Sequence, residues 1–429
     1  MSFADLRNYR SVQSAIEYAV VIVTTLFFCV SMTFAAKFSN VFDSIFDFCM
    51  LICIIAGIVS LVAQRKSIDK SIVVLTVLYF FTRLVSYKLN DITITYGGAI
   101  MLQAFYLIGV SRRFFGGKKK TRIALYTFLA FDLWAIIACF YNYHFRKEYV
   151  AGLYEEYMSQ GMITETSVFQ NPNYAGMMAG AAIVIGCTLI VNDKFKKRTV
   201  LVMCPIVILN LYLLFAITGC RSAQTGIIVT GIIAGAVAAF KRLDSVNKVV
   251  AAFLVLCFLT MVPLYVLVYW GDNEKSLSDV GPLEWQLESA SSDRYAIWKT
   301  TVLSMEGHEL FGYGNISTAW EKRKELVNNN PPDKTAEVYV LSAGYKRQHN
   351  GYLAVLNEAG IIGTICLMML LLGRARNLKG RFRDGQWEKL LLIYIFWINL
   401  FEAKFLLQVF FTGILTMILL LPNEEESAQ

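Results

Sequence analysis

The stretch "YAGMMAGAAIVIGCTLIVNDKFKKRT", residues 174–199, contains the pattern that decides the fold. Residues 174–191 contain no charged side chain, and about 17 to 22 apolar residues are what a helix needs to cross a bilayer core. Residues 192–199 then bring several Lys and Arg together, and such residues are retained on the cytoplasmic side of a membrane. The stretch therefore predicts a membrane helix that ends at the cytoplasmic face.

The same kind of apolar run recurs along the chain. Apolar residues make up 56% of the 429 residues, charged residues only 17%, and mean hydropathy is +0.51. The sequence therefore predicts an all-α integral membrane protein with about 12 transmembrane helices and one large extracytoplasmic loop with short surface helices. The other runs lie near 18–36, 44–63, 71–87, 92–110, 123–142, 200–218, 225–240, 249–270, 352–372 and 390–421, the last divided in two at the polar "FEAK".

Basic residues set the expected orientation. Alternate connections are rich in Lys and Arg, as in "SRRFFGGKKKTR" and "GRARNLKGRFRDGQWEK", which predicts that both termini are cytoplasmic and that the first run is an uncleaved helix. The net charge of +8 is then mainly an orientation signal, which argues against a nucleic-acid partner. The nine cysteines lie in or beside apolar runs without a CxxC pair, which disfavours a disulfide framework and a zinc site.

Two connections are too long to be simple turns, residues 143–173 and residues 271–351, and both are expected on the outer side. All three histidines belong to these outer segments, so we expect the functional face outside the cytoplasmic membrane. We divide the chain into four regions. Residues 1–122 form an N-terminal four-helix membrane region and residues 123–270 a central membrane region with an arginine motif. Residues 271–351 form a large extracytoplasmic loop, and residues 352–429 the C-terminal helices with a cytoplasmic tail.

The large outer loop contains one predicted helix. Ser291, Ser292 or Asp293 is the expected cap, and the helix is expected to end near Gly307. Tyr295, Trp298, Val302 and Met305 recur along one face, which predicts a helix at the membrane surface with its aromatic rings at headgroup depth. The segment "EKRKELVNNNPPDKTAEVYV", residues 321–340, is expected to be a solvated excursion with its Lys and Arg as surface charge.

Two arginines are candidates for binding phosphate. Arg221 in "AITGCRSAQTG" either anchors a helix end or, with Ser222 and other small neighbours, holds a phosphate through its guanidinium. Arg294 lies where the loop helix starts, so it is either solvated or binds an anion together with free backbone N–H groups.

His349 precedes Asn350, the expected cap of the helix that follows. The helix dipole disfavours a charged imidazole, so His349 is a candidate proton acceptor, and an interfacial histidine that only bonds a loop is the alternative. Asn173 in "NPNYAG" either belongs to a turn and helix start or contacts a sugar. Glu402 either supports this site or pairs with Lys404.

Four stretches in this order resemble the bacterial O-antigen ligase and O-antigen polymerase family of polytopic, GT-C-type membrane glycosyltransferases. They are "NPNYAG", "TGCRSAQTG", "DRYAIW" followed by "LFGYGN", and "HNGYLAVLNEAGIIG". The resemblance covers roughly residues 165 to 370. The cysteine directly before Arg221 and the "NNNPPDK" insert depart from the family pattern.

The resemblance implies a metal-independent transferase without a cofactor, in the bacterial inner membrane. Its donor would be a glycan on undecaprenyl pyrophosphate, and its other partners a glycan acceptor, the bilayer and a chain-length regulator. Arginines matching Arg221 and Arg294 would hold the pyrophosphate, and a histidine matching His349 would activate the acceptor hydroxyl. The substrate-binding residues that we place around them are Asn173, Ser222, Tyr295, Trp298, Asn350 and Glu402.

Polymerase and ligase share this scaffold, so the sequence leaves the acceptor open, as it does the sugar, its linkage and the oligomeric state. We favour a repeat-unit polymerase for O-antigen, capsule or another cell-envelope polysaccharide, with an O-antigen ligase as the alternative. A flippase or other transporter is a third reading, but transporters typically show internal repeats and charges near the bilayer midplane, and we find no repeat.

Overall fold

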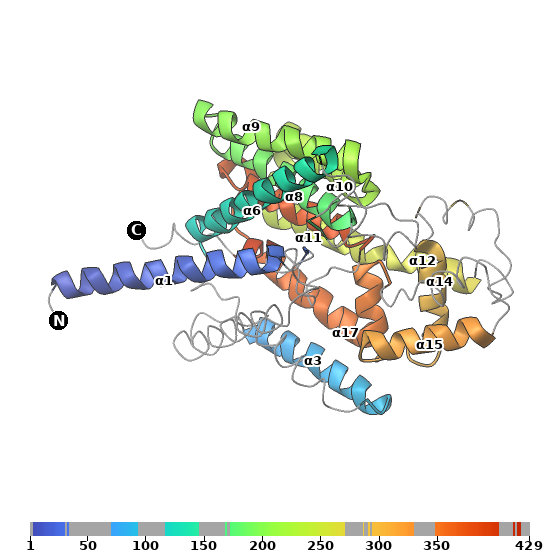
Figure 1. The fold of residues 1–429 in the computed structure, drawn as a ribbon. Helices are drawn as coiled ribbons and strands as arrows, with labels where there is room; N and C mark the ends of the chain where they lie inside the picture. Colours follow the sequence, from blue (N-terminus) through green and yellow to red (C-terminus); the bar gives the residue numbers. More distant parts are fainter. Residues whose placement is uncertain are drawn as a thin grey trace.

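The computed structural model describes residues 3–30, 32–33, 70–92, 116–145, 168–169, 172–270, 286, 291, 294–329, 348–402, 415–416 and 418–421. Within these ranges every regular element is a helix, which confirms the all-α prediction, and extended pairing is limited to two isolated bridges (Figure 1). The helices are α1 (Phe3–Val30), α3 (Lys70–Leu89), α6 (Lys118–Phe145), α8 (Pro172–Asn192), α9 (Lys197–Tyr212), η3 (Leu213–Thr218), α10 (Arg221–Ala239), η4 (Lys241–Leu243), α11 (Val246–Leu259), α12 (Met261–Trp270), α14 (Arg294–Ser304), α15 (Ile316–Asn329), α17 (Gly351–Arg376), η6 (Phe382–Asp384), η7 (Trp387–Lys389) and α18 (Leu390–Ile398).

Six helical segments among the described residues are long and apolar enough to cross a membrane. Each coincides with a run expected from the sequence, because such runs can satisfy their backbone hydrogen bonds internally only as helices. Residues 44–63, 93–110 and 403–414, which belong to three of the expected runs, lie outside the described residues, so the count of about 12 remains a prediction. The six segments are Lys118–Phe145, Pro172–Asn192, Lys197–Thr218, Arg221–Ala239, Val246–Val268 and Gly351–Arg376.

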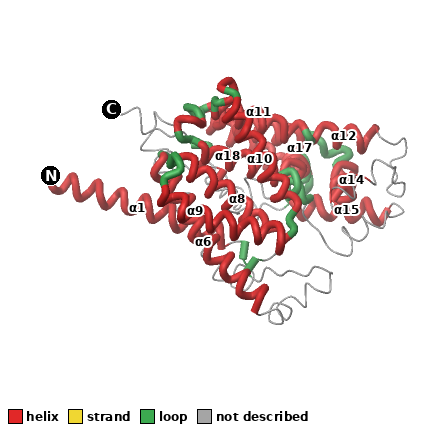
Figure 2. The backbone as a smooth tube through the Cα atoms, turned by 90° about the horizontal axis from the view of Figure 1, so that it is seen from above, coloured by secondary structure: helices red, strands yellow, loops and turns green. Residues whose placement is uncertain are grey.

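The small-residue helix α8 lies inside the bundle, packed against α6, α9, α10 and α18 (Figures 1 and 2). Its glycines allow close approach: a Cβ at Gly180 would lie 2.2 Å from the Tyr394 hydroxyl, and one at Gly176 would lie 2.3 Å from the Cys220 Cβ. The Tyr394 hydroxyl donates to the Met177 carbonyl at 2.8 Å. Van der Waals packing of small residues thus brings the N-terminal end of α8 beside the turn that opens α10.

Helix α17 is broken at Gly360, which has φ 65° and ψ −173°. The turn 309–314 fills the break. Ile361 N–H donates to the Glu309 carbonyl at 2.8 Å, and the N–H groups of Tyr313 and Gly314 donate to the carbonyls of residues 357 and 358 at 2.9 and 2.8 Å. The break therefore exposes no unsatisfied backbone to lipid at these positions, as a membrane helix requires.

Helix α3 packs along α17 and fixes this turn from the other side. The Arg83 guanidinium donates to the Gly314 carbonyl at 2.6 Å and pairs with Glu358 at 2.9 Å. The Ser86 hydroxyl donates to the Gly312 carbonyl at 2.8 Å. The N-terminal part of the chain is thereby tied to the helix that follows His349.

The predicted loop helix exists as α14, but its surroundings differ from our expectation. It ends at Ser304 and a turn continues to Gly307. Val302 and Met305 are fully buried, Tyr295 is 3% exposed, and the helix packs on α12, α15 and α17. Protein therefore covers this face, and its depth relative to the bilayer stays a prediction.

The segment from residue 321 onward was expected to be solvated, with its Lys and Arg as surface charge. For residues 321–329 this was wrong in two respects, the helix and the burial of Arg323. Residues up to Asn329 continue the amphipathic helix α15, and the Arg323 side chain is fully buried. Burial lowers the pKa of Arg323 to about 10, since an apolar environment disfavours the charged form. Residues 330–340 lie outside the described residues.

Candidate functional site

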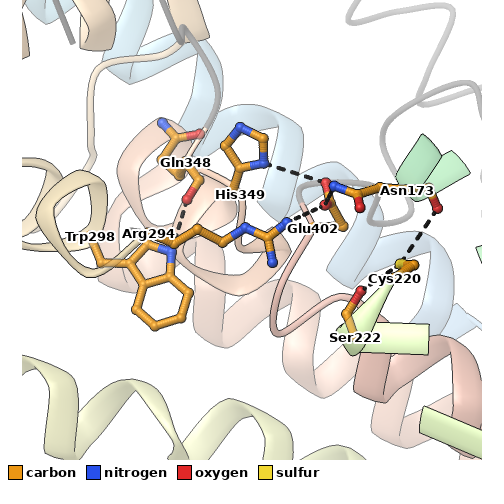
Figure 3. A network of polar contacts seen from close by, with 8 residues as sticks. All are labelled: Asn173, Cys220, Ser222, Arg294, Trp298, Gln348, His349 and Glu402. Carbon is orange, nitrogen blue, oxygen red and sulfur yellow. Dashed lines mark hydrogen bonds and ion pairs between the residues drawn. The ribbon is translucent and has the colours of Figure 1, made fainter. Parts of the chain in front are cut away.

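Glu402 lies at the centre of a polar network that joins distant parts of the chain (Figure 3). It follows α18, where its N–H donates to the Ile398 carbonyl at 3.0 Å, and it is 3% exposed. Arg294 Nη2 lies 2.8 Å and Asn173 Nδ2 3.1 Å from Glu402 Oε1. His349 Nδ1 lies 3.5 Å from Oε2, an ion-pair distance slightly longer than a normal hydrogen bond. The carboxylate thus brings together three residues predicted from separate motifs.

The network forms where four helices begin. Asn173 is in the first turn of α8, Cys220 is the N-cap of α10, Arg294 opens α14, and Asn350 is the N-cap of α17. The N-terminus of a helix carries a partial positive charge and unsatisfied N–H groups, which favour a nearby anion. Together with the Arg294 guanidinium, this arrangement favours negative charge at the site.

The turn before α10 places Arg221 beside this network. The π-helix η3 ends at Gly219, which has φ 59°, a conformation that glycine adopts without strain. Cys220 Sγ then lies 3.8 Å from the Asn173 carbonyl and 3.3 Å from the Ser222 hydroxyl. Burial raises the pKa of the Cys220 thiol, so it remains protonated and can donate in these contacts. Arg221 follows directly, with an exposed side chain.

His349 has an unusual backbone conformation between two anchored residues. Its φ is 50°, in the left-handed region, which costs a non-glycine residue about 1–2 kcal/mol. After it, Asn350 caps α17: its Oδ1 accepts from the N–H groups of Tyr352 and Leu353, both at 3.0 Å, which confirms the predicted cap. Before it, the Gln348 carbonyl accepts from Trp298 Nε1 at 3.0 Å.

The structure brings most of the predicted residues together. Three of them contact Glu402, which was itself predicted: Asn173, Arg294 and His349. Ser222 and Trp298 join through one intermediate, Cys220 and Gln348 respectively. Tyr295 is buried, and its N–H donates to the Ser291 hydroxyl at 3.0 Å, so Ser291 satisfies one backbone donor in the first turn of α14. Lys404, the alternative partner of Glu402, lies outside the described residues.

Sequence reasoning missed Gln348, although it stands directly before His349. Its side chain is fully buried and donates from Nε2 to Asn357 Oδ1 at 2.9 Å. Polar residues within an apolar membrane run are costly and usually functional, and Asn357 in "LAVLNEAGIIG" is such a residue. That signal would have pointed to the pair.

The geometry of the acidic, histidine and cysteine side chains bears on metal ligation. Among the residues described, no group of three or more His, Cys, Asp or Glu side chains has the spacing to hold a metal ion. Metal independence nevertheless remains a prediction, which the transfer assay proposed below tests directly.

Comparison with known proteins finds one matching family model, which covers the middle of the chain. Residues 205–368 match the family model described as O-antigen ligase, a range that contains Arg221, Arg294 and His349 but not Asn173 or Glu402. The searches of curated proteins and of solved structures each gave no significant match. The match and the six apolar helices fit a multi-pass protein of the bacterial inner membrane with a role in polysaccharide glycosyl transfer. The match supports the assignment of this chain to the O-antigen ligase and polymerase family.

Proposed function

We propose that the chain is a polysaccharide repeat-unit polymerase. It transfers a glycan from undecaprenyl pyrophosphate to a sugar hydroxyl of the acceptor, on the outer face of the cytoplasmic membrane, with both termini inside. The observation that carries this proposal is the contact of Arg294 and His349 with one buried carboxylate, Glu402, where four helices begin.

Arg294 and Arg221 are the proposed pyrophosphate ligands. A guanidinium has five N–H donors, and the bond of Arg294 to Glu402 is made by Nη2 alone. Arg221 opens α10 with its side chain exposed, so it can reach a lipid-linked substrate that arrives from the membrane. Both arginines and the helix N-termini stabilise the charge that develops on the leaving pyrophosphate.

His349 is the proposed base. A proton on Nδ1, which faces Glu402, leaves Nε2 as the acceptor nitrogen. In the reaction, the acceptor hydroxyl loses its proton to Nε2 and its oxygen bonds to the anomeric carbon. The bond from that carbon to the pyrophosphate oxygen breaks, and undecaprenyl pyrophosphate leaves with the electron pair. The Glu402 carboxylate then stabilises the imidazolium.

The other predicted residues support this assembly. We assign Glu402 a positioning role in addition to its predicted contact with substrate, because three protein side chains meet its carboxylate. Asn173, which contacts Glu402, and Ser222 and Trp298, which join through Cys220 and Gln348, remain proposed substrate contacts, as do Tyr295 and Asn350. The domain division and a chain-length regulator remain proposals as well.

An O-antigen ligase is the second candidate, because the matching family model carries that description. A ligase moves the glycan to lipid A core or another separate acceptor, whereas a polymerase joins it to another lipid-linked glycan. The two differ in the acceptor that they need, so one assay separates them.

The test is transfer in vitro with the purified chain, undecaprenyl-pyrophosphate glycan and EDTA. We expect a ladder of lengthened lipid-linked glycan, which His349→Ala and Arg221→Ala abolish. His308→Ala and Arg198→Ala are matched controls and should retain the ladder, since both residues lie outside the network. Transfer only to an added acceptor would identify a ligase. A fully active His349→Ala variant would exclude His349 as the base, and loss of activity in EDTA would exclude metal independence.

A further inference from the structure

The conformation of His349 requires support from its neighbours. A histidine at φ 50° is strained, so the surrounding structure has to hold it there. On its C-terminal side the backbone is fixed twice: Asn350 caps α17, and the Gly351 N–H donates to the Asn399 carbonyl at 2.7 Å. On its N-terminal side the described part of the chain begins at Gln348, so the support for the His349 backbone on that side has to be sought in the contacts of Gln348.

Gln348 is fixed through its carbonyl, as Figure 3 shows, and also through its side chain. Its carbonyl accepts from Trp298 Nε1 at 3.0 Å, and Trp298 lies one turn after Arg294 on α14. Its side-chain Nε2 donates to Asn357 Oδ1 at 2.9 Å, and both side chains are fully buried. The peptide that enters His349 is therefore tied to the helix that carries Arg294 and to α17.

The anchor Asn357 is itself held rigidly. It lies just before the break at Gly360, and its carbonyl accepts from the Tyr313 N–H at 2.9 Å. The next residue, Glu358, pairs with Arg83 of α3 at 2.9 Å. The hydrogen bond to Asn357 thus connects Gln348 to α17 and, through it, to the turn 309–314 and α3.

We propose that Gln348 is a positioning residue that sets the backbone of His349 and so directs the imidazole at Glu402. Gln348 takes no part in bond making or proton transfer; it acts only through His349. This inference rests on the proposed function, because it assumes that His349 is the base.

The test compares Gln348→Met, which keeps the length of the side chain without its amide, with the milder Gln348→Asn, which is too short to reach Asn357. Full-length protein in lipid vesicles is assayed for kcat and for the Kd of undecaprenyl-pyrophosphate glycan. We expect kcat to fall about 10- to 100-fold, since misplacing a reacting group by about 1 Å has an effect of that size. The Kd of the donor should stay within about two-fold, because the pyrophosphate ligands are elsewhere.

Tyr352→Phe is the matched control. It removes another buried hydrogen bond of the same helix, from the Tyr352 hydroxyl to the Phe396 carbonyl at 3.0 Å, without touching Gln348. We expect its kcat to remain within about two-fold of wild type even where its unfolding midpoint falls.

Two outcomes would overturn the proposal: wild-type kcat in either Gln348 variant, or a fall in kcat matched by an equal loss of donor binding, which indicates general damage. His349→Ala, measured under the same conditions, distinguishes a failure of the proposed function from a failure of the role assigned to Gln348. A fully active His349→Ala means that the proposed function has named the wrong base, whereas an inactive His349→Ala beside an active Gln348→Met refutes only the role of Gln348.

Discussion

The position of Glu402 illustrates how a buried carboxylate is kept in an apolar protein. A buried charge is costly unless it is paired and hydrogen-bonded. Here the side chain is 4% exposed and is met by Arg294 and His349, with Asn173 as a third partner. The same pairing orients the proposed base and one proposed pyrophosphate ligand, so removing the charge should affect the chemistry as well as the stability of the site.

We predict that Glu402→Gln lowers kcat about 10- to 100-fold, equivalent to about 1.4–2.8 kcal/mol of lost transition-state stabilisation. The amide keeps the shape of the side chain and can still accept from Arg294, but it cannot stabilise an imidazolium at His349. The measurement is the initial rate of glycan transfer at saturating donor.

Glu325→Gln is the control for this change, because Glu325 forms an exposed pair with Lys322 on α15. Surface pairs of this kind contribute little, so its rate should equal that of wild type. An unaltered rate in Glu402→Gln would remove Glu402 from the mechanism.

At the scale of one element, α17 combines two functions that a straight helix could not. Its first half begins at Asn350, next to His349, and its second half continues to Arg376. The break at Gly360 lets the turn 309–314 dock against it, which fixes that turn on the helix. Glycine is needed there for two reasons, the positive φ and the lack of space for a Cβ.

We predict that Gly360→Ala destabilises the protein by at least about 2 kcal/mol and lowers its transfer rate. A Cβ at this position would lie 2.3 Å from the carbonyl carbon and oxygen of Leu310, and the φ of 65° is strained for alanine. The measurement is the midpoint of thermal unfolding in detergent, with the transfer rate at a permissive temperature.

Gly373→Ala is the control in the same helix. A Cβ added at Gly373 would meet none of the described atoms within 4 Å, and alanine is the better helix former by about 1 kcal/mol. Its midpoint should equal or exceed that of wild type. Equal midpoints in the two variants would mean that the docked turn does not contribute to stability.

At the scale of the whole molecule, the N-terminal region supports the part of the chain that carries the candidate site. The family match begins at residue 205, yet α3 packs against α17 and holds the turn 309–314 through Arg83 and Ser86. The Arg83 side chain is 6% and the Glu358 side chain 16% exposed. Breaking a buried pair by removing one partner is strongly destabilising, because the other charge remains without compensation.

We predict that Arg83→Met destabilises the protein by about 3–5 kcal/mol, and that Arg83→Met/Glu358→Leu recovers part of this loss since it leaves no unpaired carboxylate. Thermal unfolding of both variants in detergent provides the measurement. Arg122→Met, which removes a pair with Asp193 at 3.2 Å on a side chain that is 36% exposed, should cost less than about 1 kcal/mol. A double variant less stable than Arg83→Met would contradict the assigned role of the pair.

The sequence alone determined the helical class, the described membrane segments and the local caps. These are set by interactions close in the chain: an apolar run of bilayer length has to be helical, and Asn350 caps the residues directly after it. It also singled out Arg294 and His349, because each stands where an expected helix begins, and Glu402, because a charged group within an apolar run is costly.

Only the tertiary structure decided how these residues meet. The contacts of Glu402 with Asn173 and Arg294 join residues 229 and 108 positions apart, and no local pattern encodes such a distance. Packing likewise buried Arg323, which we expected as surface charge, and Tyr295, Val302 and Met305 of α14, which we expected at the membrane surface. A periodic pattern tells which face of a helix is apolar, but whether lipid or protein covers that face depends on the other helices, and so does the support that Gln348 gives to His349.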